Sequence, residues 1–409
     1  MMYKNLFLYQ KLNYNLTYKF RNKYFFLFPL YFIFLFLVSL VSSLIKPIFK
    51  TKLKIKTHLF ITFSKNQLKI SNIFNTHCAD LHFDFINFKV KSLKISIFQN
   101  LIYFGLVNGL SLSSLLKILK INNYKFFKMN WFRICNLVFI EAVLKRIKDI
   151  EKLVIISNDH SIYNNFIINW CKFNNVETMY IQHAPVSEKF PPLRCDYNIL
   201  FSKSSEVIYS KISSINVNYK VYSDFRLINL LNLKIDKYVN DKSILICTNE
   251  LDEVENVKKY IDFFIKINYD VTIRKHPADR KNWTIENTNF SINSLYEDFT
   301  NNNIILCNET ALFLEAAICD KLIYKCNFSP FLDFYGYLRD GLIIKEYYTP
   351  DQLYTDIKKK YVSYDKDKLI FHTGDLLNHK SHISEINNFL LTYKYNHNGY
   401  KKNTSRLIS

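Results

Sequence analysis

The stretch LVIISNDHSIYNNFIINWCKFNNVETMYIQHAPV, residues 153–186, decides the fold class of this chain. It opens with a short apolar run at residues 153–157, and residues 161–173 then carry apolar side chains at helical spacing. A second short apolar run follows at residues 178–181. Two buried strands separated by one helix are typical of a parallel βαβ unit. The stretch therefore predicts an α/β protein built on a parallel sheet.

The same alternation continues along the chain and predicts two domains. A third strand is expected at residues 197–201, and a second alternating series begins near residue 242. That series predicts strands at 243–247, 270–274, 303–306 and 322–324 and helices at 252–267 and 310–318. Two doubly wound, Rossmann-like domains would place a ligand cleft between the carboxyl ends of their strands.

The domain boundaries follow from these two series, because 409 residues are too many for one ordinary core. We assign residues 51–226 to an N-terminal domain and residues 241–394 to a C-terminal domain, with a polar linker at 227–240 and a solvated basic tail at 395–409. Residues 51–150 show a weaker pattern, with strands expected at 58–63 and 83–90 and helices at 110–119 and 131–147. No GxGxxG or Walker sequence is present, which counts against NAD enzymes and P-loop NTPases.

The N-terminal segment, residues 1–50, contains a predicted membrane helix. Residues 24–45 carry no charge and are mostly aromatic and aliphatic, and as a helix they would be about 33 Å long, enough to cross a bilayer. Five basic residues precede this stretch and five follow it, so the positive-inside rule leaves its orientation open. A single span and a re-entrant helix that bends at Pro29 both fit this pattern.

Charge and cysteine content limit the possible partners. The chain has a net charge of +20, yet no Asp or Glu occurs before Asp80, so a large basic excess lies beside the predicted membrane helix and suits anionic lipid head groups. No zinc-finger spacing, RNP-like motif or basic helix with a heptad is present, and we expect no nucleic-acid partner. The eight cysteines form no C-x-x-C pair, so neither a disulfide framework nor a metal site is expected.

The N-terminal domain carries one polar cluster after its strand at 153–157. This cluster contains Asn158, Asp159 and His160 and is followed by Ser161. An acid beside an imidazole at a strand end could act as a general base or hold a hydroxyl group. Asn, Asp and Ser are also the preferred N-cap residues, so helix capping is the alternative interpretation.

A second cluster follows the strand at 178–181. It begins with Gln182 and His183 and continues to Glu188, in a loop that three prolines stiffen. The prolines help to hold the imidazole and the carboxylate in defined directions. A histidine that is merely packed in the core is the alternative.

The C-terminal domain carries two further clusters at strand ends. Arg274 and His276 lie two residues apart at the end of a strand, on the same face, where they could grip a phosphate group. Asn308, Glu309 and Thr310 enter a helix, where backbone N–H groups and the Thr hydroxyl could bind an anion. Together the two clusters predict a phosphate grip in this domain.

These motifs resemble those of a known family of enzymes. The order NDHS (158–161), IQHAPVSEKFPPL (181–193), RKHP (274–277) and NETALFLEA (308–316) resembles GT-B glycosyltransferases of bacterial capsule and O-antigen synthesis. It is similar more loosely to bacterial polysialyltransferases and to the CDP-glycerol glycerophosphotransferases of teichoic acid assembly. The likeness covers residues from about 150 to about 340.

The resemblance implies roles for individual residues. His276 would contact the phosphate of the donor, and Glu315 would bind the ribose of its nucleotide. Asn308 to Thr310 would occupy the place of the paired serines that these families use for the same phosphate. This sequence departs from that pattern, because Glu309 and Thr310 stand where the family has Ser-Ser.

The residues and the resemblance together lead us to expect a particular reaction, location and set of partners. Asp159, His183 or Glu188 would deprotonate an acceptor hydroxyl, which displaces the nucleotide with inversion, without a metal or other cofactor. The donor would be a nucleotide-activated sugar and the acceptor a polysaccharide or a lipid-linked glycan. The enzyme would sit at the bacterial inner membrane with its catalytic domains in the cytoplasm. A sugar-nucleotide epimerase of similar fold and a non-catalytic scaffold of a polysaccharide-assembly complex are the alternatives.

Overall fold

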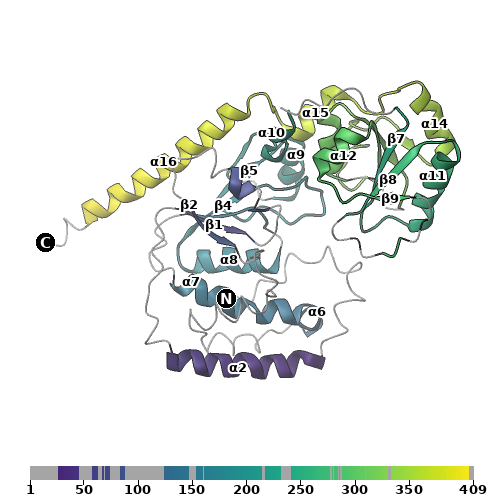
Figure 1. Ribbon diagram of the computed structural model, residues 1–409. Coiled ribbons are helices and arrows are strands. Elements are labelled where there is room, and N and C mark those ends of the chain that lie inside the picture. Colours follow the sequence, from purple (N-terminus) through teal and green to yellow (C-terminus); the bar gives the residue numbers. More distant parts are fainter. Residues whose placement is uncertain are drawn as a thin grey trace.

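In the computed structural model the chain forms two six-stranded sheets, each with an adjoining layer of helices (Figure 1). The structure describes residues 26–45, 58–62, 67–68, 70–73, 83–87, 124–146, 153–159, 161–213, 217–231, 241–276, 279, 281–283, 285, 288–308, 310–329 and 333–404. All strand pairs within the two sheets are parallel over these residues. The predicted α/β class with two doubly wound sheets is confirmed.

The N-terminal sheet has the strand order β2-β1-β3-β4-β5-β6. Its strands are β1 (His58–Thr62), β2 (Phe83–Asn87), β3 (Leu153–Ile156), β4 (Glu177–Ile181), β5 (Tyr197–Leu200) and β6 (Tyr219–Val221). Its helices are α6 (Tyr124–Cys135), α7 (Leu137–Arg146), α8 (Ile162–Phe173) and α9 (Lys203–Ile212). Strands β1 and β3 are buried throughout, as continuous apolar runs in a covered parallel sheet should be. The helix expected at 110–119 lies outside the described residues.

The C-terminal sheet has the strand order β12-β11-β10-β7-β8-β9. Its strands are β7 (Ser243–Cys247), β8 (Asp270–Arg274), β9 (Asn289–Phe290), β10 (Ile304–Cys307), β11 (Leu322–Cys326) and β12 (Glu346–Tyr347). Its helices are α11 (Val254–Lys266), α12 (Leu295–Asn301), α13 (Leu312–Ile318), α14 (Pro350–Lys358) and α15 (Lys366–Thr373). The strand order reverses between β7 and β10, so the carboxyl ends of these two strands form a switch point, where open α/β sheets bind ligands.

The chain crosses between the two domains at a short turn, η3 (Phe225–Leu227), followed by α10 (Ile228–Leu231). Phe225 is buried in the core of the N-terminal domain and Leu227 in the core of the C-terminal domain. The predicted polar linker at 227–240 is therefore wrong at its start, because Leu227 and Ile228 are buried. Residues 232–240 lie outside the described part of the chain.

The last helix, α16 (His379–Thr404), returns to the N-terminal domain. Ile383, Ile386 and Leu390 lie on one helical face and are buried in the core cluster of that domain. In Figure 1 this helix leaves the C-terminal domain and runs past the N-terminal sheet. Two expectations change as a result. Residues 383–391 pack with the N-terminal domain, and the tail expected from residue 395 is helical as far as Thr404.

Helix α2 (Phe28–Ile45) lies along the N-terminal domain and packs against α6. The ring of Phe28 meets those of Phe127 and Trp131, and the Tyr31 hydroxyl donates a hydrogen bond to Asn136 Oδ1 at 2.6 Å. Among the described residues, no helix combines the length and apolar character needed to cross a bilayer. The predicted membrane helix is therefore not confirmed.

Candidate functional site

A cavity of about 280 Å³ opens at the carboxyl ends of β7, β8 and β10. These strands are neighbours in the sheet, so the residues that follow them meet at one edge. The cavity therefore lies at the switch point of the C-terminal sheet. It is lined by Arg226, Cys247, Thr248, Arg274, Lys275, His276, Leu295, Thr310, Ala311, Leu312 and Glu315.

Two cationic side chains at the end of β8 line this cavity and are held from behind. Arg274 donates from Nη1 to Oδ2 of Asp298 at 2.5 Å and to the carbonyl oxygen of Asn293 at 3.1 Å. Asp298 is 1% exposed at its side chain, so it fixes one end of the guanidinium in the protein interior. The Nζ of Lys275 donates to the carbonyl oxygen of Lys281 at 2.9 Å. Both positive charges are thus oriented before any ligand arrives.

His276, Thr310 and Glu315 complete the part of the cavity wall that the sequence predicted. His276 follows Lys275 and is exposed, Thr310 follows β10, and Glu315 lies on α13 and is half-buried. The structure thus brings Arg274, His276, Thr310 and Glu315 together. Glu309 and Pro277 lie outside the described residues.

Arg226 was not predicted, and it is the cavity residue that comes from the crossover between the domains. Its Nε donates to both carboxylate oxygens of Asp224, at 2.8 and 3.2 Å, and its Nη2 also donates to Asp224. Burial alone would lower the pKa of Arg226, but the nearby Asp224 and Glu315 carboxylates more than offset it, so the guanidinium stays charged. No motif marks this residue in the sequence. The sequence feature that could have indicated it is the pair Asp224 and Arg226, two residues apart and just after a strand.

Asn308 does not line the cavity, although the sequence placed it in the phosphate grip. It is 3% exposed, and its Nδ2 donates to Asp252 Oδ1 at 3.1 Å and to Ser329 Oγ at 2.6 Å. Burial raises the pKa of Asp252 to about 6. Asn308 therefore supports the fold behind the cavity and is not among its lining residues.

The first cluster of the N-terminal domain is largely buried. Asn158 Oδ1 accepts a hydrogen bond from the Ser161 backbone at 2.9 Å, and Ser161 caps α8, so the capping interpretation holds for these two residues. Asp159 is 1% exposed, and its charge acts on Tyr180 and other buried neighbours, whose pKa values are raised chiefly by burial. Its assignment as a general base stays a prediction that this burial does not favour. His160 lies outside the described residues.

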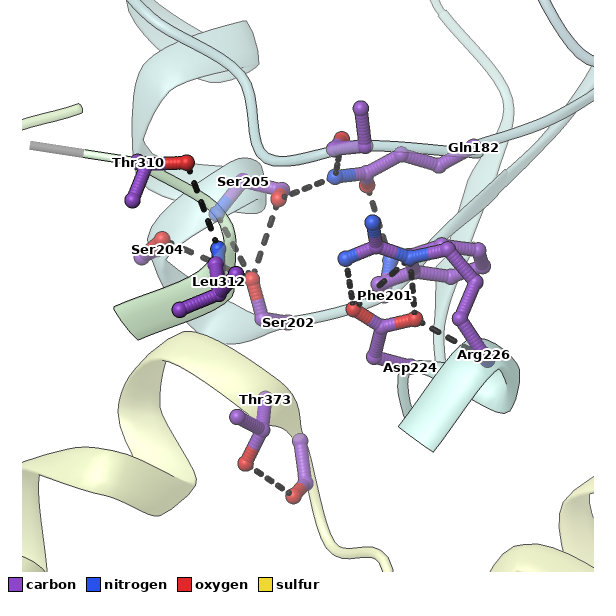
Figure 2. A network of polar contacts seen from close by, with 12 residues as sticks. Gln182, Phe201, Ser202, Ser204, Ser205, Asp224, Arg226, Thr310, Leu312 and Thr373 are labelled. Carbon is purple, nitrogen blue, oxygen red and sulfur yellow. Dashed lines mark hydrogen bonds and ion pairs between the residues drawn. The ribbon is translucent and has the colours of Figure 1, made fainter. Parts of the chain in front are cut away.

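Gln182 is part of a hydrogen-bond network that joins β4, β5 and α9 (Figure 2). Its Nε2 donates to Ala184 O at 2.8 Å and to Ser205 Oγ at 2.9 Å, and its Oε1 accepts from the Phe201 backbone at 2.9 Å. These bonds use both donor hydrogens of the amide and join it to the backbone at Ala184, so Gln182 positions the loop that carries His183. His183 itself is half-buried at the carboxyl end of β4 and is not among the residues that line the cavity.

Glu188 connects the two domains on their surface. Its Oε1 accepts hydrogen bonds from Lys211 Nζ and from Arg339 Nη1, both at 3.1 Å. Next to it, the ring of Phe190 meets that of Phe334 edge-on at 6.4 Å. The carboxylate is thus paired with two cations. Its role as a general base also stays a prediction.

Two parallel doubly wound sheets, with a polar cavity at the switch point of the second, define the GT-B fold that the motifs indicated. No family model and no curated protein sequence matches the chain. Among solved structures, a variant of the wall teichoic acid polymerase TagF is similar with a TM-score of 0.50 and 12% identity, over 94% of this chain and 99% of that chain. MurG from Acinetobacter baumannii follows with a TM-score of 0.42 and 9% identity, over 82% of this chain and 100% of that chain. The likeness to TagF establishes the fold.

Proposed function

We propose that this protein is a glycosyltransferase that moves a sugar or sugar-like unit from a nucleotide-activated donor to a bacterial surface polysaccharide. The carrying observation is the cavity at the switch point, where three cationic side chains, Arg226, Arg274 and Lys275, meet the imidazole of His276. Such a set favours a phosphate group over a neutral ligand, because guanidinium groups bind phosphate oxygens through paired, charge-assisted hydrogen bonds.

The proposed reaction is a displacement at the sugar carbon that carries the nucleotide. An acceptor hydroxyl loses its proton to a base, its oxygen forms a bond to this carbon, and the bond from the carbon to the phosphate oxygen breaks with inversion. The leaving phosphate gains negative charge, which Arg274, His276 and Thr310 stabilise. In this proposed reaction the cationic side chains stabilise the leaving phosphate, and a metal ion has no role. Glu315 is proposed to bind the ribose.

Among the three predicted bases, His183 has the most favourable placement. Asp159 is 1% exposed, and Glu188 is paired with Lys211 and Arg339. A base must reach the acceptor hydroxyl and change its protonation state during the reaction. His183 is half-buried at a strand end, in a loop that Gln182 anchors. We therefore assign the proton transfer to His183, with closure of the two domains bringing it to the donor.

The proposed acceptor is a capsule or O-antigen polysaccharide, or a lipid-linked precursor of one. The fold is shared with TagF, which is described as a wall teichoic acid polymerase, and a teichoic acid is also a polymer of the cell surface. The comparison with TagF supports this acceptor by analogy of fold, and the sequence motifs at 158–161, 181–193, 274–277 and 308–316 provide the other support.

We further propose that the protein works at the cytoplasmic side of the inner membrane and that α2 rests flat on the lipid. One face of α2 packs on α6, whereas Leu30, Ile33 and Leu37 on the opposite face are more than half exposed. An apolar helix face flanked by basic residues is typical of a helix that lies in the membrane interface. The five basic residues on either side of the stretch at 24–45 would meet anionic head groups.

Substitution of His276 tests the proposed reaction. We expect His276→Ala to lower transfer by about 100-fold, within the range found for removal of one group that stabilises a developing charge. Transfer of labelled sugar from CMP-, CDP- and UDP-linked donors to membranes of the source strain is the measurement. Near-normal turnover in the variant would refute the assignment. Release of sugar without an acceptor would favour the epimerase, and absence of binding to any nucleotide would favour the scaffold.

A further inference from the structure

Arg226 occupies a special position in the molecule, because its two neighbours are anchored in different domains. Phe225 is fully buried in the core cluster of the N-terminal domain, where its ring meets Phe201 edge-on at 5.9 Å. Leu227 is fully buried in the core cluster of the C-terminal domain. The guanidinium of Arg226 nevertheless lines the cavity of the C-terminal sheet. It is therefore supplied from the point where the chain passes from one domain to the other.

The guanidinium is held firmly at one edge. Asp224 is 2% exposed and accepts hydrogen bonds from the Nε, the Nη2 and the backbone nitrogen of Arg226. Asp224 is itself fixed, because its backbone nitrogen donates to Thr373 O of the C-terminal domain at 2.7 Å. The guanidinium carbon also lies 5.9 Å from the centroid of the Phe201 ring. This packing leaves the side chain few other orientations.

The other edge of the same guanidinium carries an unused donor. Within the described part of the chain, Nη1 of Arg226 has no hydrogen-bond partner, although the side chain is only 12% exposed. Figure 2 shows this third nitrogen turned away from Asp224. A largely buried charged donor without a partner is costly unless a ligand completes its bonds. A phosphate oxygen in the cavity would do so.

We propose that Arg226 binds the phosphate groups of the donor through its free Nη1 edge and thereby joins Arg274 and Lys275 in the grip. This inference rests on the proposed function and adds a specificity-determining residue to it. A nucleoside diphosphate or inorganic pyrophosphate has enough anionic oxygens for all three cations, whereas a neutral sugar has none. Arg226 thus favours phosphate-bearing ligands, and it does so at the boundary between the domains.

Calorimetric titration of the full chain with inorganic pyrophosphate, CDP and UDP tests the proposal. We expect Arg226→Met to weaken binding of pyrophosphate, and of whichever nucleotide binds the wild type, by about 10- to 100-fold, the loss of one hydrogen bond to a charged group. Arg339→Met is the matched control, because Arg339 also bridges the domains but lies outside the cavity lining. It should bind these ligands as the wild type does.

A second variant covers the case in which Arg226→Met does not fold. Arg226→Lys keeps the charge and can still pair with Asp224, but it lacks the second donor edge, so binding should weaken by about 10-fold. Wild-type affinity for pyrophosphate in either folded variant would overturn this proposal and leave the proposed function standing. A wild-type protein that binds none of the three ligands would instead refute the proposed function itself.

Discussion

A buried polar network lies behind the cavity and supports its floor. Asn308 joins Asp252 on the loop before α11 to Ser329 after β11. Asp252 also accepts a hydrogen bond from the Asn249 backbone at 2.7 Å. Because Asp252, Asn308 and Ser329 are buried, the network fixes three loops relative to one another, and a partly satisfied network of this kind would be costly.

The pKa of Asp252 gives this network a measurable pH dependence. Burial raises this pKa from 3.8 to about 6, so between these values the folded protein holds a proton that the unfolded chain has released. The free energy of unfolding should therefore fall by up to about 3 kcal/mol as the pH rises through this window. Asp252→Asn should lack that decrease. Urea unfolding of both proteins at several pH values checks this, and parallel profiles would contradict it.

At the residue scale, the sequence predicted which residues lie at the edge of the sheet better than it predicted where their side chains point. The motifs placed Arg274, His276 and Thr310 correctly at the edge where the cavity opens. They did not show that the amides of Asn308 and Gln182 turn inward to hydrogen-bond with the fold. Side-chain direction at a strand end depends on the loop that follows, and local spacing does not determine it. Arg226 was missed for a related reason, since its site forms only when distant segments meet.

At the scale of elements, α2 has two faces with different surroundings. Tyr31, Leu35 and Val38 are buried against the protein, whereas Leu30, Ile33 and Leu37 are exposed. Exposed apolar side chains that are contiguous on a surface are typical of interaction sites, which is the basis of the proposed membrane contact. The basic residues that flank this helix in the sequence are the reason for proposing anionic lipid as its partner.

Charged substitutions on the outward face of α2 test the proposed membrane contact. Ile33→Glu with Leu37→Glu should weaken binding to vesicles that contain anionic lipid by at least about tenfold, because each side chain loses about 1.5–3 kcal/mol of apolar burial. The control is Ile370→Glu with Leu377→Glu, at exposed apolar positions on and after α15. Co-sedimentation with vesicles is the measurement. Equal loss of binding in both double variants would contradict a contact through α2.

Elements of the two central sheets could be predicted closely from the sequence. The strands at 243–247 and 270–274 match β7 and β8 residue for residue, because short apolar runs between turn residues leave few alternatives. Helix α16 was not predicted, and most of its residues were assigned to the C-terminal domain, whereas its buried face packs with the N-terminal domain. Its apolar stripe shows that one face is buried but not which sheet covers it, since that depends on packing between distant segments.

At the scale of the whole molecule, close contact between the domains depends on Gly374. This residue follows α15 and has a φ of +71°. A Cβ atom placed there would lie 2.2 Å from the carbonyl oxygen of Tyr222 and 2.5 Å from that of Phe201, both in the N-terminal domain. Backbone from both domains therefore meets at a point where only glycine fits.

Gly374→Ala should separate the domains at this point. The left-handed backbone alone costs about 1–3 kcal/mol for alanine, and the clash with Tyr222 and Phe201 adds to it. Gly341→Ala is the control, because Gly341 has a φ of +77° but no atom within 4 Å of the added Cβ. Gly374→Ala should show the larger fall in unfolding midpoint and a larger radius of gyration by X-ray scattering. A similar response from both variants would rule out a role for domain contact.

Within the part of the chain that the structure describes, two connections join the domains, one at η3 and one between α15 and α16. They are in contact where the Asp224 backbone nitrogen donates to Thr373 O. Two neighbouring connections allow the domains to rotate about the line that joins them. Rotation about any other axis would stretch one or both connections. Motion between the halves should therefore reduce to a swing about one axis. Arg226 lies in η3, at the first of these connections, where such a rotation would displace atoms least. The guanidinium of Arg226 would consequently keep the same orientation in the open and in the closed arrangement of the two domains.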